Sequence, residues 1–178
     1  RRRPFGPPLR AFRPKPGTFR RVVRPVVGGR GRARGNGRIG FRPLPGQPTV
    51  RDLIALQAAF AGALEGLHAS EHPVGGLEWA TARDNFYAAT RDGLDASLEW
   101  VTDDGRETTD TATMYDELFD YATRGLRSRG LSDEQIDRYL APLRHRVRTG
   151  MTPAAWKHRH VADRVEAGAS LAEGIAHA

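Results

Sequence analysis

Two arginines at alternate positions of a short, strand-like segment are the first candidates for chemistry. The segment Arg38-Ile39-Gly40-Phe41-Arg42 predicts a β-strand with Ile39 and Phe41 on one face and both arginines on the other. Guanidinium groups pair well with phosphate and carboxylate groups, so this face could hold an anion. The same alternation is also typical of the solvated face of an edge strand, and this is the preferred interpretation when the residues are taken alone.

The histidines of the sequence do not predict a metal site. His158 and His160 are two positions apart on a predicted helix, so their rings would point in different directions. His68 and His72 flank a loop beside Glu71, without the spacing of a known metal site.

The remaining polar candidates have plain structural explanations. Asp103 and Asp104 precede a glycine and are interpreted as turn residues rather than an acid/base pair. Arg83, Asn85 and Arg91 could line a substrate pocket, but a solvated helix face explains them as well. Because the sequence has no cysteine, disulfides, thiolate metal sites and cysteine nucleophiles are excluded.

Charge divides the chain into two parts. Residues 1–51 hold 15 of the 28 Lys and Arg and no acid, which gives +15, and residues 52–178 hold 13 basic against 21 acidic residues, which gives −8. Residues 1–37 are rich in Arg, Pro and Gly and predict a disordered or extended basic arm, followed by a folded part over residues 38–178. No apolar run reaches the roughly 18 residues of a membrane span, so a cytoplasmic protein is expected.

Helices dominate the elements that would position these residues. They are expected over about residues 50–68, 78–92 and 112–129, followed by one helix that ends at Gly150 and one that begins at Pro153, with a hairpin between residues 94 and 109. Thr49 is a predicted N-cap with Asp52 three residues later, Ser132 and Gln135 predict a capping box, and Thr152 is a predicted N-cap before Pro153. The inner faces are predicted to contain Leu53, Phe60, Leu64 and Leu67 in the first helix, Trp79, Ala82, Phe86 and Ala89 in the second, and Ile136, Leu140, Leu143 and Val147 in the fourth.

Three segments resemble one known family in their order along the chain. Residues 37–49 (GRIGFRPLPGQPT) resemble the late active-site strand of the glutamate–cysteine ligases. Residues 82–96 resemble that family's Arg/Asn segment followed by Gly-Leu, and residues 150–156 resemble its C-terminal Gly-x-Thr-Pro-Ala element. A weaker similarity begins at residue 16, so the resemblance covers about residues 16–178.

The resemblance implies an α+β chain with a glutamine-synthetase-like fold. The chain would be its C-terminal portion, mostly helical with one or a few antiparallel strands and the basic arm. The implied reaction joins glutamate and cysteine through an acyl phosphate, with ATP and Mg²⁺. In the family the strand reads Arg-x-Glu-x-Arg, so Arg38 and Arg42 would be catalytic. Arg21, Arg24 and Arg83 would contact substrate.

Gly40 departs from the family pattern, because it stands where the metal-binding Glu is expected. No metal ligand is therefore predicted, and we expect a C-terminal fragment that is inactive alone. Apolar faces left without a neighbour would favour self-association. The alternative function is a helical binding module whose Arg/Gly arm binds nucleic acid nonspecifically through phosphates, although the few aromatic residues in the arm make nucleic acid the less favoured partner.

Overall fold

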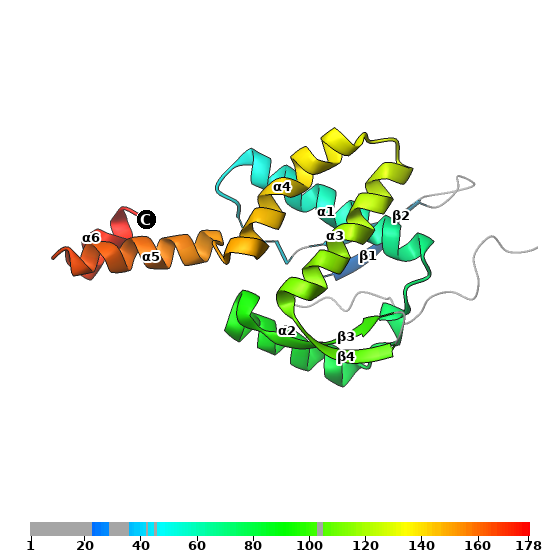
Figure 1. Cartoon of the computed structure of the whole chain (residues 1–178), viewed down its shortest axis with the longest axis horizontal. Helices are drawn as coiled ribbons and strands as arrows, with labels where there is room; N and C mark the ends of the chain where they lie inside the picture. Colours follow the sequence, from blue (N-terminus) through cyan, green and yellow to red (C-terminus); the bar gives the residue numbers. More distant parts are fainter. Residues whose placement is uncertain (1–22, 29–35, 42, 45, 103–104) are drawn as a thin grey trace, which may run out of the picture. The chain divides into compact units, whose positions relative to one another are not determined.

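The computed structural model describes residues 23–28, 36–41, 43–44, 46–102 and 105–178, which fall into two compact units, residues 1–46 and 47–178 (Figure 1). The described part of the first unit is an antiparallel ribbon of β1 (Val23–Gly28) and β2 (Asn36–Phe41). The predicted strand is thus confirmed, and β1 lies within the segment predicted as a disordered or extended arm. Arg42 lies outside the described residues.

The second unit is helical apart from one hairpin, so the described chain is α+β and mostly helical. Its helices are α1 (Val50–Ala69), α2 (Trp79–Asp92), α3 (Thr111–Ser128), α4 (Asp133–Thr149), α5 (Pro153–Glu166) and α6 (Leu171–Ala176). Short 3₁₀ turns, η2 (Pro73–Gly76) and η3 (Gly93–Asp95), flank α2. Strands β3 (Ser97–Thr102) and β4 (Gly105–Asp110) form the predicted hairpin, although Asp103 and Asp104 lie outside the described residues. None of the described helices is long and apolar enough to cross a membrane.

The core lies where α1, α3 and α4 pack together (Figure 1). Ile136 and Leu140 of α4 are fully buried against Ala122 and Leu126 of α3. A second cluster joins Ala55, Phe119 and Leu143. The predicted inner face of α4 is therefore confirmed, and its capping box between Ser132 and Gln135 is also present.

The buried face of α1 is not the predicted one. Leu53 and Leu64 are 43% and 44% exposed, whereas Ala55, Gly62 and Gly66 are buried. Leu53 and Leu64 lie on the opposite side of the helix from these small residues, whereas Leu56, Phe60 and Leu67 are half-buried. Small residues are buried because they allow α1 and α3 to approach at backbone distance: a Cβ added to Gly62 would lie 2.5 Å from the carbonyl oxygen of Ala122.

The predicted inner face of α2 is also wrong. Trp79 is 80% exposed and Phe86 is 56% exposed, and Tyr87 beside it is exposed as well. The helix instead turns Asn85 toward β3, where the amide side chain bonds to the strand. The aromatic residues of α2 therefore contribute little to the core of this unit.

Local capping signals explain where the helices begin and end. The Thr49 hydroxyl accepts the Asp52 N–H at 3.1 Å, as the predicted N-cap requires. Gly150 ends α4 with φ of 65°, a left-handed conformation that favours glycine. Thr152 then caps α5, which begins at Pro153, and α5 packs against α6 with Val161 close to Gly174.

Candidate functional site

The ribbon brings two of the predicted arginines to one face. Arg24 of β1 pairs directly with Gly40 of β2, and Val26 pairs with Arg38. Directly paired residues of an antiparallel ribbon share a face, as do alternate residues of one strand. Arg24, Arg38 and Gly40 therefore belong to the same face of the ribbon, opposite the face of Ile39.

The other predicted site residues are not brought to this group. Arg21 and Arg42 lie outside the described residues. Arg83 lies on α2 in the second unit, where its guanidinium is 52% exposed and pairs with Asp84 at 2.8 Å. This local pair occupies Arg83 without defining a pocket around it.

The segment that contains the ribbon is basic and has no acidic residue. Neither Arg24, Arg38 nor Gly40 has an acidic side chain, and residues 1–46 hold 14 Lys and Arg and no acid. Across the described residues, no group of three or more His, Cys, Asp and Glu is placed to hold a metal ion.

Asn85 has a structural role in the segment that resembles the family's Arg/Asn motif. Its side-chain amide donates to the carbonyl oxygen of Glu99 at 2.6 Å and accepts the Glu99 N–H at 2.9 Å. This pair of bonds fastens β3 to α2. Nearby, Arg91 forms an exposed pair with Asp92, whose hydrogen bond raises the pKa of Arg91 and lowers the pKa of Asp92.

The Gly-x-Thr-Pro-Ala element is a turn between two helices. Gly150 ends α4, and the Thr152 hydroxyl accepts the Ala155 N–H at 3.1 Å to begin α5. Trp156 then stacks on His160 with ring centroids 5.0 Å apart. This element therefore sets the position of α5 through its backbone, and its polar groups are used in capping.

A buried polar cluster centred on His72 was not predicted. The His72 side chain is fully buried, its Nδ1 accepts the Val74 N–H at 3.1 Å, and its Nε2 lies 3.3 Å from Glu117. Because Nδ1 is an acceptor, Nε2 carries the proton that is donated to Glu117. Trp100 donates its indole N–H to the same carboxylate, so Glu117 connects α3 with β3 and with the turn η2.

A second unpredicted cluster joins the beginning of α1 to the end of α4. Arg146 pairs with Asp52 at 2.8 Å, and both side chains are nearly buried, at 16% and 15% exposed. Arg146 also donates to the Gln47 side chain at 2.9 Å. His72 and Glu117 are 45 residues apart in the sequence, and Gln47 and Arg146 are 99 residues apart. At such separations the sequence contains no spacing pattern that would predict the contact.

Comparison with known proteins gives one match. A family model described as glutamate–cysteine ligase family 2 matches residues 12–174, which includes the ribbon and nearly all of the helical unit. A search of the curated proteins found no match, and neither did a search of the solved structures.

Proposed function

The chain belongs to glutamate–cysteine ligase family 2, and from this premise we propose that its ribbon face serves the ATP-dependent joining of glutamate and cysteine on a glutamine-synthetase-like fold. The observation that carries the proposal is the register of the ribbon. It groups Arg24 and Arg38 around Gly40 on one face, which is the arrangement that an anionic reacting group needs.

The proposed reaction has two steps. The γ-carboxylate oxygen of glutamate takes the γ-phosphoryl group of ATP, which releases ADP and forms an acyl phosphate. The amine nitrogen of cysteine then attacks the acyl carbon, phosphate leaves with the electrons of the C–O bond, and the nitrogen loses a proton. Negative charge on the phosphoryl oxygens must be neutralised in the first step, and arginines are suited to do so.

In this proposal Arg38 and Arg42 contact the transferring phosphoryl group. Arg24 and Arg21 on the preceding segment hold a substrate carboxylate or an ATP phosphate, and Arg83 of α2 makes a further substrate contact. Magnesium normally accompanies ATP in such chemistry and neutralises its phosphates. Since Gly40 has no carboxylate and the described residues contain no acidic cluster, we assign no metal ligand and no step that depends on one.

We expect this chain alone to bind ATP and to release no ADP in the presence of glutamate, cysteine and Mg²⁺. ATP binding can be measured by equilibrium dialysis with radiolabelled nucleotide. Arg38→Gln should weaken binding by about tenfold, since one charge-assisted hydrogen bond contributes about 1.5–3 kcal/mol. Arg138→Gln is the matched control, because Arg138 is an exposed arginine of α4 paired only with Glu134 in the described chain. Equal loss in both variants would show that the ribbon face is not the ATP site.

Restoring the carboxylate tests the same site in a second way. Gly40→Glu places an acid directly opposite Arg24. If position 40 is where metal is held, Mg²⁺ should strengthen ATP binding in the variant and not in the parent chain. A variant that responds to Mg²⁺ as the parent does would contradict the role assigned to this position.

A further inference from the structure

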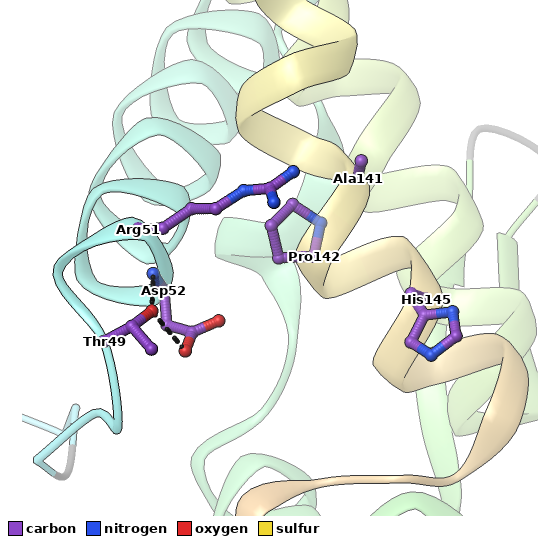
Figure 2. A pocket seen from close by; sticks show the side chains of 6 residues that line it. All are labelled: Thr49, Arg51, Asp52, Ala141, Pro142 and His145. Atoms are coloured by element: carbon purple, nitrogen blue, oxygen red, sulfur yellow. Dashed lines mark hydrogen bonds between the residues drawn. The ribbon is translucent and has the colours of Figure 1, made fainter.

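A hollow of about 470 Å³ lies in the second unit between the beginning of α1 and the middle of α4 (Figure 2). Its wall consists of Thr49, Arg51, Asp52, Ala141, Pro142 and His145. The hollow is open to solvent, because Thr49, Arg51, Ala141 and His145 of its wall are exposed and Asp52 and Pro142 are half-buried. None of these residues takes part in the ligase chemistry proposed above.

The one acidic group of the wall is already neutralised. One oxygen of Asp52 pairs with Arg146 at 2.8 Å. The other oxygen accepts the Thr49 hydroxyl at 2.8 Å, a bond that is drawn in Figure 2. Both side chains of the Asp52–Arg146 pair are about five-sixths buried, so solvent screens this pairing less than it would a surface pair. The carboxylate therefore leaves no net negative charge to repel an anion.

A cation of the wall has no such partner. Among the described residues Arg51 forms no ion pair, and its side chain extends from α1 toward Pro142 of α4 (Figure 2). Arg51 also belongs to the first turn of α1, a helix of 20 residues whose amino end carries partial positive charge. The hollow is therefore electropositive.

The opposite wall supplies both a donor and an apolar surface. His145 Nδ1 lies 3.4 Å from the Arg148 guanidinium, which can only donate, so Nδ1 is the acceptor and Nε2 carries a proton. Ala141 and the ring of Pro142 present carbon atoms to the same space. An inorganic ion would leave this apolar surface uncovered.

We propose that this hollow is a binding site for a small organic anion, in which Arg51 holds the carboxylate or phosphate group and Pro142 contacts the apolar body. This function is separate from the ligase function proposed for the ribbon. The shared chemistry is a single oxyanion attached to a compact carbon skeleton, and carboxylates and phosphate esters both provide it.

The test is an NMR titration of the ¹⁵N-labelled full chain with phenyl phosphate, benzoate and neutral benzyl alcohol. We expect saturable shifts in the amide signals of residues 49–52, 141 and 143–145 with the two anions, and at least about tenfold weaker binding of benzyl alcohol. Arg51→Gln should weaken anion binding by about tenfold, and Arg138→Gln on α4 should leave it unchanged. The stronger of the two anions identifies the site as one for phosphate esters or for carboxylates.

Other results would overturn the proposal. Binding of benzyl alcohol as strong as that of the anions would show an apolar hollow without anion recognition. Unchanged affinity in Arg51→Gln, or an absence of saturable shifts at residues 49–52, 141 and 143–145, would show that the anions do not bind in the hollow. Shifts of ribbon signals bear on the ligase proposal and do not count in this test. Because the signals followed here belong to the hollow and the variants of the ligase test belong to the ribbon, failure of one proposal leaves the other unaffected.

Discussion

Replacing Gly62 by alanine should destabilise the helical unit, because α1 and α3 meet there at backbone distance. The added Cβ would lie 2.5 Å from the Ala122 carbonyl oxygen and 2.8 Å from Cγ of Leu126, whereas ordinary contact begins at 3.4 Å. The carbonyl oxygen belongs to a helix backbone and cannot rotate away as a side chain would. The difference between 3.4 Å and 2.5 Å requires the two helices to separate locally by about 0.9 Å.

The magnitude follows from two opposed effects. A gap of about 0.5–1 Å removes a quarter to a half of the attraction between atoms that were in contact, and overpacking of this kind costs about 1–3 kcal/mol. Alanine gains about 1 kcal/mol over glycine in helix propensity. Because the added Cβ would collide with backbone, we take the upper end of this range as the cost of overpacking. The free energy of unfolding should therefore fall by about 2 kcal/mol, and Tm by about 4–8 °C.

The assay is urea and thermal unfolding of the full chain, followed by far-UV circular dichroism. Gly75→Ala is the matched control, since a Cβ at Gly75 would meet nothing within 4 Å. The control should stay within about 0.5 kcal/mol of the parent. If Gly62→Ala proves as stable as the control, the helices do not approach at backbone distance and the reasoning fails.

Three further perturbations test other parts of the structure. Glu117→Ala should lower the free energy of unfolding by about 2–4 kcal/mol in urea titrations, because it leaves the donors of His72 and Trp100 without an acceptor. The pKa of Asp110 lies below its ordinary value, chiefly because its carboxylate accepts backbone and side-chain bonds at the beginning of α3, so its contribution to stability is present above about pH 5 and is lost on acidification. Asp110→Asn should therefore flatten the fall in unfolding free energy between about pH 5 and pH 2, and an unchanged slope would contradict this role. Trp79→Ser should reduce self-association of the chain in light scattering, because Trp79 is 80% exposed; a parent chain that stays monomeric at high concentration would refute this expectation.

Signals that act within a few residues predicted the structure well. The caps at Thr49, Ser132 and Thr152 and the glycine stop at Gly150 lie where the sequence placed them. Each of the three caps depends on one side chain and a backbone group no more than three residues away. The hairpin is likewise local, since its strands pair from Thr102 and Gly105 outward.

The faces of α1 and α2 could not be predicted in the same way. The apolar stripe that includes Leu53 and Leu64 indicates which large side chains would gain free energy from burial. It carries no information on how closely the backbones of two helices can approach. Gly62 and Gly66, four positions apart, were the available signal for that approach. For α2, the exposed Trp79 has no counterpart in the described chain that would bury it.

The candidate site was predicted from a family resemblance, because the residue pattern alone does not show which arginines come together. Alternation placed Arg38 opposite Ile39 on its strand, but the pairing of Arg24 with Gly40 depends on the register between strands. The register depends on which residues of the two strands pair, and a single sequence does not specify this pairing. The same limit applies to Asp52 and Arg146, which meet only after α1 and α4 have packed.

The two hydrogen bonds between Asn85 and Glu99 affect how readily the molecule can aggregate through the exposed edge of β3. A strand at the margin of a sheet can accept a strand from another molecule, and this is a common route to aggregation. Asn85 occupies both the N–H and the carbonyl oxygen of Glu99 on the side of β3 that faces away from β4. The side chain thus acts as a single-residue mimic of a neighbouring strand and blocks intermolecular pairing at Glu99.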